Sequence, residues 1–347
     1  MHNYKQLDIY RITAIWAFSE AALGGVLHAL RFPFTGLFIG SASVLFISLI
    51  GINSQSYSQI IRATLIVVIV KALVAPVSPL AAYFSVSLQG VLGYLLFSIL
   101  GKTKITMVLL GLFSLLLSAL QKIILTTILF GMLFWEAIDS FALTVTSQIP
   151  LLKEIKSYSA SLIIIIIYSV LHIIAGIYAG LTAAKSDKWL SETNDLEILK
   201  EIDSTREGEF FSRMNSNKKK VWWKRKSGII IFLFLVIMIL FSIFFPTSTS
   251  IQTLDVLFII IRSLVITYVW FVFISPILVR YFQKYVKKKE SENANEVMRI
   301  TRLFPHFKSI VTFTWKKSEN MKGLLRIKNF IRDSFLLLLL TEENTNG

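Results

Sequence analysis

The sequence predicts an all-α, polytopic integral membrane protein, a bundle of about eight transmembrane helices (six plus two) with cytoplasmic amphipathic helices. The 347 residues are 54% hydrophobic and have a mean hydropathy of +0.66, whereas a soluble domain is about 45–50% apolar. Several runs reach about 20 apolar residues, the length that crosses a hydrocarbon core as a helix. Lipid offers the backbone no hydrogen bonds, so these runs must be helical.

The predicted spans come in two groups separated by a charged segment. In chain order they cover residues 12–30, 34–52, 61–75, 80–100, 105–133, 160–184, 228–245 and 257–279. Arg31-Phe32-Pro33 breaks the first pair, and Pro76 and Pro79 separate the third span from the fourth, because proline has no N–H to donate within a helix. Four domains are expected: a six-helix solute-binding bundle (1–184), a charged cytoplasmic linker (185–226), a transmembrane hairpin (227–281) and a basic amphipathic cytoplasmic tail (282–347).

The charge distribution predicts the orientation. The net charge is +15, with eleven Lys or Arg in 185–226 and fourteen from Arg280 onward. Cations gather in cytoplasmic segments of membrane proteins, so we expect both termini to be cytoplasmic, in a bacterial inner membrane, and no nucleic-acid partner. The tail has apolar residues near helical spacing in 303–315 and 321–340, with basic residues between them. Such helices lie on an anionic inner leaflet or dock on a partner.

Polar residues inside the spans are the candidate functional groups. A charge at mid-membrane costs roughly 2.5–3.5 kcal/mol even on the mildest scale, so such groups usually face a bundle interior. The solute-binding candidates are Glu20, His28, Arg31, Lys71, Gln89, Lys122, Glu136, Tyr168 and His172. Several lie toward the outer half of the first six spans, where an outward-opening cavity would hold a captured solute.

Structural roles are the alternatives for these residues. Arg31 and Glu136 could sit at the interface, and Lys71 could snorkel to the outer headgroups. Lys122 could pair with Glu20, and His172 could bond a neighbouring carbonyl. A metal site formed by His28, His172 and Glu20 is a weaker alternative, and we expect no metal or cofactor.

Small residues predict close helix packing. Ala17, Ala21 and Gly25 recur every four residues in the first span, and Gly176 and Gly180 do so in the sixth. Small-xxx-small faces let membrane helices approach closely. The faces would serve packing within the protein or docking of another membrane protein.

Residues 12–184 resemble the substrate-binding subunits (S components) of energy-coupling factor vitamin transporters. The resemblance rests on six spans of this length, the Ala17/Ala21 face and the segment KALVAPVSPLAAYFSVSLQGVLG at 71–93. It implies capture of a micronutrient on the outer side, then toppling within the membrane against a scaffold subunit driven by two cytoplasmic ATPases. It also implies Gln89, Tyr168 and His172 as ligand contacts. Residues 185–347 depart from the family, and 285–340 lack the short Ala-Arg-Gly motifs with which the scaffold grips ATPases.

These observations are compatible with three functions, of which we expect solute transport. The chain would be a transport subunit that takes up a vitamin-like solute, with the lipid bilayer as its surroundings and a transmembrane scaffold and ATPases as its partners. It would otherwise be a membrane scaffold whose tail recruits partners, with its buried charges paired among themselves. A lipid-modifying membrane enzyme is the third reading. The chain has no cysteine and no HExxH, GxSxG or phosphate-loop pattern, so we expect no enzyme.

Overall fold

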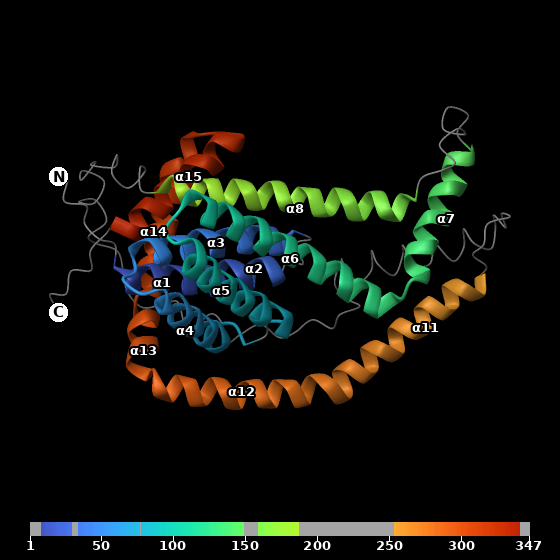
Figure 1. Cartoon of the computed structure of the whole chain (residues 1–347), viewed down its shortest axis with the longest axis horizontal. Coiled ribbons are helices and arrows are strands. Elements are labelled where there is room, and N and C mark those ends of the chain that lie inside the picture. Colours follow the sequence, from blue (N-terminus) through green and yellow to red (C-terminus); the bar gives the residue numbers. More distant parts are fainter. Residues whose placement is uncertain (1–7, 30–33, 77, 149–158, 187–252, 341–347) are drawn as a thin grey trace. The chain divides into compact units, whose positions relative to one another are not determined.

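The computed structural model describes residues 8–29, 34–76, 78–148, 159–186 and 253–340 (Figure 1). All regular structure in these residues is helical and none of it is a β-strand, which confirms the all-α prediction. Five of the described helices are long and apolar enough to cross a membrane: Thr35–Asn53, Leu80–Leu100, Lys104–Phe130, Ala160–Ala184 and Val256–Glu292. The predicted span at 228–245 and all but the first two residues of the 185–226 linker lie outside the described residues.

The chain forms two compact units whose boundaries differ from the predicted domains. The first unit comprises Met1–Ser118, His172–Phe210 and Phe282–Gly347, and the second comprises Ala119–Leu171 and Phe211–Tyr281. The predicted six-helix bundle is thus divided between the units, and the tail groups with the first spans. Each unit is described separately below.

The first unit begins with a helix that changes its winding. Asp8 accepts a hydrogen bond from the Tyr10 N–H (3.0 Å) and caps α1 (Ile9–Phe18), since an Asp side chain at this position satisfies a free backbone donor. The π-helical turn η1 (Ser19–Leu23) follows, and α2 (Gly24–Ala29) continues the run. A π turn adds a residue to the local winding. Residues spaced by four therefore do not stay on one helix face across this turn.

Three further helices pack around α1. They are α3 (Thr35–Asn53), α4 (Ser58–Val74) and α5 (Leu80–Leu100); α4 packs on α1 and α5, and α3 does the same (Figure 1). Glycines let α5 approach the others: a Cβ on Gly51 would lie 2.6 Å from the Phe97 ring, which is closer than real contacts allow. Pro79 caps α5 in an extended conformation, as expected from the proline break.

The helix α6 (Lys104–Phe130) meets α8 (Ala160–Ala184) through glycines within the first unit. A Cβ on Gly111 would overlap the Gly176 carbonyl, and a Cβ on Gly180 would overlap the Met107 carbonyl. The helices therefore touch backbone to backbone, which only glycine permits. Gly176 and Gly180 serve packing within the protein at this crossing.

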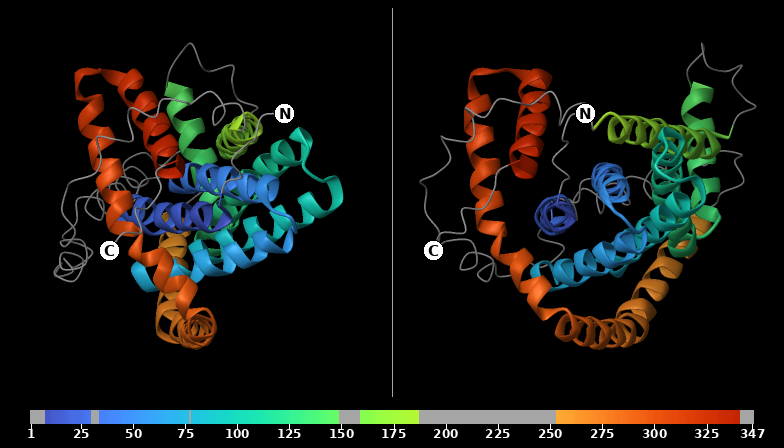
Figure 2. Two further views of the ribbon diagram at one scale, coloured as in Figure 1. Left: turned by 90° about the vertical axis from the view of Figure 1, so that its left-hand side faces the viewer. Right: turned by 60° about the vertical axis from the view of Figure 1, so that its left-hand side comes forward.

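The tail folds onto the first unit. α13 (Ala294–Arg302) packs on α1 and α4, whereas α14 (Phe304–Lys317) and α15 (Gly323–Leu340) pack on α1 and on each other. Figure 2 shows α14 and α15 as neighbouring red helices, joined by the short 3₁₀ turn η6 (Ser318–Asn320). The Phe18 ring lies 5.2 Å from the Phe304 ring and 5.7 Å from the Phe307 ring.

The prediction that the apolar face of 303–315 lies on the membrane leaflet is therefore wrong for Leu303, Phe304 and Phe307. Leu303, Phe304 and Phe307 are buried in the core. The apolar face of α14 is used against the protein's own helices, because burial against a packed bundle removes the same apolar surface from water.

The second unit contains a helix that the sequence analysis missed. α7 (Leu133–Gln148) lies between the predicted spans 105–133 and 160–184, where no helix was predicted. Gly131, with φ +81°, ends α6 before it, since glycine adopts positive φ without steric cost. α11 (Thr253–Val269) packs on α7. The π turn η5 (Trp270–Ile274) continues from α11. α12 (Ser275–Glu292) follows it beyond the predicted end of the last span, and its residues from Phe282 on belong to the first unit.

Candidate functional site

A buried ion pair joins α4 to the π turn of the first unit. Lys71 Nζ lies 2.6 Å from Glu20 Oε2, and both side chains are 1% exposed. Glu20 stands in η1, and Lys71 stands in the last turn of α4. Charges inside a membrane bundle usually pair with one another. The alternatives in which Lys71 snorkels to headgroups, or Glu20 pairs with Lys122, are both wrong.

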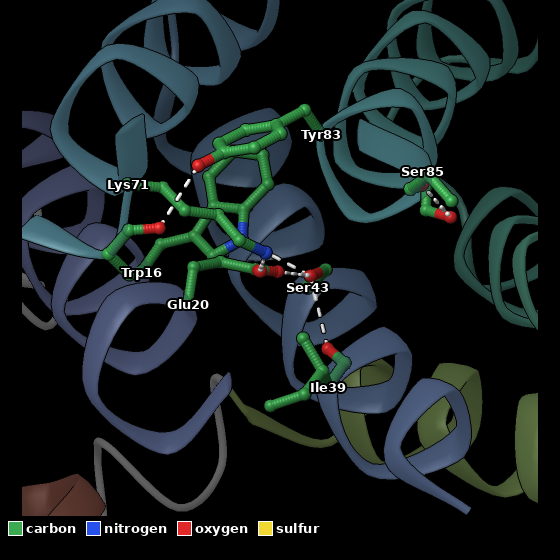
Figure 3. A network of polar contacts seen from close by, with 9 residues as sticks. Trp16, Glu20, Ile39, Ser43, Lys71, Tyr83 and Ser85 are labelled. Carbon is green, nitrogen blue, oxygen red and sulfur yellow. Dashed lines mark hydrogen bonds and ion pairs between the residues drawn. The ribbon is translucent and has the colours of Figure 1, made fainter. Parts of the chain in front are cut away.

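Two neighbours complete this ion-pair cluster, which we define as Trp16, Glu20, Ser43 and Lys71. The Ser43 hydroxyl donates to Glu20 Oε1 (2.6 Å), and Trp16 Nε1 donates to the Ser43 oxygen (3.2 Å). Figure 3 shows these side chains converging from α1, η1, α3 and α4. The carboxylate thus has a charged partner on one oxygen and a hydroxyl donor on the other, which offsets its desolvation.

Tyr83 closes one side of the ion-pair cluster. Lys71 Nζ lies 5.9 Å from the centre of the Tyr83 ring, which suits a cation–π contact. The Tyr83 hydroxyl donates to the Ala75 carbonyl at the end of α4 (3.1 Å). A helix-end carbonyl is thereby satisfied, and the ring is held in place above the ammonium.

A second group of polar side chains gathers around Gly40 of α3. A Cβ on Gly40 would lie 3.2 Å from Gln89 Nε2 and 2.6 Å from Leu115 Cδ2. Gln89 of α5 and Leu115 of α6 therefore both reach the bare backbone of α3. Gln89 is buried within the bundle.

The glycine crossing brings His172 to the same level. Gly176 lies against Gly111, and Gly180 lies against Met107, so α6 and α8 run antiparallel. One turn further along, His172 falls level with Ser114 and Leu115 of α6. Both His172 and Ser114 are buried (1% exposed each), and the Ser114 hydroxyl has no hydrogen-bond partner.

We call Gln89, Ser114 and His172 the polar layer. It consists of one buried polar side chain from each of α5, α6 and α8. Gly40 and Ser43 are three residues apart on α3, which places them on adjoining parts of one helix face. Gln89 and the ion-pair cluster therefore lie against the same part of α3.

The predicted solute-binding residues that the structure describes are divided between the two units. Glu20, Lys71, Gln89 and His172 lie in the first unit, whereas Lys122, Glu136 and Tyr168 lie in the second. Lys122 and Glu136 are exposed, and Tyr168 is partly buried. The His28 side chain and the whole of Arg31 lie outside the described residues.

The small residues of the first span differ in how deeply they are buried. Ala17 and Ala21 are buried in the helix core, at 0% and 2% exposure. Gly25 is only partly buried, and a Cβ there would meet nothing within 4 Å. Ala17 and Ala21 therefore serve packing within the protein.

Asp139 of α7 caps the N-terminal end of α8. Its carboxylate accepts hydrogen bonds from the Ser161 N–H (2.7 Å) and from the Ser159 hydroxyl (2.9 Å). Ser159 in turn accepts from the Leu162 N–H (3.2 Å). These groups cap the start of α8, and a negative charge there complements the helix dipole.

Sequence reasoning missed Trp16, Ser43, Tyr83 and Ser114. Trp16 precedes Glu20 by four residues, a spacing that could have placed both on one face. Gly36 and Gly40 form a small-xxx-small pair that could have marked the face of α3. Ser114 has no such signal, because single hydroxyls are common in apolar helices.

Metal ligands do not cluster in this part of the chain. Among the described residues, no group of three or more His, Asp or Glu side chains could hold an ion. Comparisons with protein-family models, curated proteins and solved structures found no match to the chain. The likeness to vitamin-transporter subunits therefore rests on the sequence features alone.

Proposed function

We propose that the chain is a membrane transport subunit that captures a small, vitamin-like solute from the outer side. The observation that supports this proposal is the polar layer: three helices, α5, α6 and α8, each bury one polar side chain within the first unit, and Gln89 lies against Gly40. Polar groups in membrane helices are costly and usually mark solute or ion pathways. The resemblance to S components favours the same function and names Gln89 and His172 among the contacts.

The Ser114 hydroxyl favours binding over a purely structural role. A buried polar group without a partner costs about 1–3 kcal/mol. The hydroxyl has no partner, and a solute with hydrogen-bonding groups would satisfy it. The neighbouring Leu115 and Gly40 are apolar, and a mostly apolar lining with a few polar groups suits a small amphipathic molecule.

We also propose a bacterial inner-membrane location with both termini in the cytoplasm. The concentration of Lys and Arg in 185–226 and beyond Arg280 supports this orientation. The energy for uptake would come from a separate membrane scaffold and its cytoplasmic ATPases, since the chain has no phosphate-loop pattern.

Thermal stabilisation of the purified protein by a panel of water-soluble vitamins tests the proposal. At least one compound should raise the unfolding temperature of the wild type. Ser114→Ala and Gln89→Leu should lose that rise. Ser48→Ala is the matched control, because Ser48 of α3 is also a buried hydroxyl without a partner but lies two turns from Gly40. Absence of any shift in folded protein, or equal shifts in all variants, would contradict solute capture.

A scaffold function is the second candidate, and two observations favour it. Glu20 and Lys71 neutralise each other, and the tail helices are fixed to the bundle, as a rigid platform requires. In that case no solute would shift the unfolding temperature. A stable complex with a cytoplasmic protein would instead dissociate when the exposed lysines of α14 are reversed to glutamate.

A further inference from the structure

The hairpin of α14, η6 and α15 has an inner face that the protein itself covers. Thr314 and Ser334 share a hydrogen bond (2.6 Å) between the two helices. Arg11 Nε donates to the Leu338 carbonyl (2.7 Å), and the Phe46 and Phe335 rings lie 6.1 Å apart. The second half of α15 is thereby anchored to α1 and α3.

The first half of α15 is different, because its apolar side chains remain exposed. Leu325, Ile327 and Ile331 are 60%, 48% and 59% exposed. Trp315, at the end of α14, is also exposed and stands edge-on to Phe330 (5.1 Å). About half of the apolar surface of each of these side chains therefore stays uncovered, and burial of that surface would be favourable.

Basic residues run beside this apolar surface. The stretch 315–333 holds six Lys or Arg against two acidic residues, and one of the acids, Asp333, is paired with Arg332 (2.9 Å). Lys322, Lys328 and Arg332 are exposed. On a helical projection, Ile327 and Ile331 form one stripe and Lys328 and Arg332 form the next.

The tip of the hairpin joins both kinds of surface. The Arg326 guanidinium lies over the Trp315 ring at 4.2 Å. A cation held on an indole at a helix turn suits the boundary between headgroups and acyl chains, where tryptophan and arginine are both favoured. An apolar stripe beside a basic stripe is the pattern of a helix lying in that boundary.

We propose that this surface, defined as Trp315, Lys322, Leu325, Ile327, Lys328, Ile331 and Arg332, binds the anionic headgroup region of a lipid bilayer. Its charge is complementary to anionic phospholipids. The isoleucines would rest at the acyl boundary while Lys328 and Arg332 contact phosphates. The inference is independent of solute capture, since it involves none of the residues of the polar layer.

Single-cysteine labelling tests the proposal, because the chain contains no cysteine. An environment-sensitive fluorophore is attached at Ile331→Cys in full-length protein in nanodiscs of phosphatidylcholine, with or without phosphatidylglycerol. Met298→Cys on α13 is the matched control, since Met298 is an equally exposed apolar side chain (51%) outside the surface. Quenching is measured with nitroxide-labelled lipid and with aqueous iodide.

The Ile331→Cys label should be quenched by labelled lipid several-fold more in anionic discs than in neutral ones, and high salt or Lys322→Gln with Lys328→Gln should remove the difference. The Met298→Cys label should respond equally in both. Iodide access that is the same in neutral and anionic discs would overturn the proposal. If the label becomes protected from iodide only at high protein density, the surface would bind a second copy of the chain. If protection needs an added protein, the surface would bind that protein. Ile327→Cys, on the same stripe, repeats the measurement if the Ile331 variant unfolds.

Discussion

Lys71 and Glu20 form an ion pair of 2.6 Å between α4 and a π turn, and both side chains are almost fully buried. The pair links two helices that are 51 residues apart. The pair also holds the π turn, which follows directly after Phe18. The Phe18 ring itself packs against Phe304 and Phe307 of the tail helix α14. The first helix is therefore held at the residue before the π turn and again within the turn.

Removing one partner of this pair should cost more than removing both. Lys71→Met leaves Glu20 charged and buried, which should cost about 3–5 kcal/mol of unfolding free energy. Glu20→Gln with Lys71→Met removes both charges and should recover much of that loss. Chemical denaturation in detergent measures the three free energies. A double variant as unstable as Lys71→Met would show that the two charges are not coupled.

The glycine crossing of α6 and α8 should reject any side chain. Gly176→Ala places a methyl group against the Gly111 backbone and should cost at least about 1–3 kcal/mol. Gly25→Ala is the matched control, because a Cβ there meets nothing within 4 Å, and it should be neutral or slightly stabilising. Unfolding temperatures compare the two. Equal effects would mean that α6 and α8 are not in backbone contact.

The cap at the start of α8 should depend on Asp139 and not on its neighbour. Asp139→Ala removes the acceptor of the Ser161 N–H and should destabilise the protein by about 0.5–2 kcal/mol. Glu136→Ala, on the same helix but exposed, should have little effect. Hydrogen exchange of the amides at 161 and 162 gives a local measurement. Faster exchange in both variants would contradict the capping role.

The tail should be held by aromatic packing rather than by its surface ion pair. Phe304 is fully buried against Phe18, so Phe304→Ala should cost about 3–5 kcal/mol. The Arg62–Glu296 pair is 2.9 Å long, but the Arg62 side chain is 69% exposed. Arg62→Gln should therefore cost no more than about 1 kcal/mol. Limited proteolysis of the tail ranks the two variants, and a larger effect of Arg62→Gln would contradict this account.

Hydropathy was sufficient to predict the helical class and most helix positions. Runs such as 80–100 and 160–184 are apolar throughout, and the helices α5 and α8 cover them. α7 was not predicted because residues 133–148 contain Glu136 and Asp139. These two charges lower the mean hydropathy of the segment, although one part of the helix surface is packed. The local sequence carries no record of that packing.

The site was predictable only in part, because partners came from distant helices. Glu20 and Lys71 were both identified as charges inside predicted spans. The sequence does not show which spans are neighbours, so Lys122 was an equally acceptable partner for Glu20. The π turn also altered the face of the first helix without any distinctive residue. Ser114 acquires its place only through the Gly111–Gly176 crossing, which sets the register of α6 against α8.

Native mass spectrometry of the purified protein tests solute capture most directly. The account predicts that wild-type protein carries, at one molecule per chain, the compound that stabilises it thermally. Ser114→Leu, which fills the polar layer, should release that molecule while Ser48→Ala keeps it. A wild-type protein that stays empty with every compound offered, or a Ser114→Leu variant that binds as well as wild type, would contradict the account.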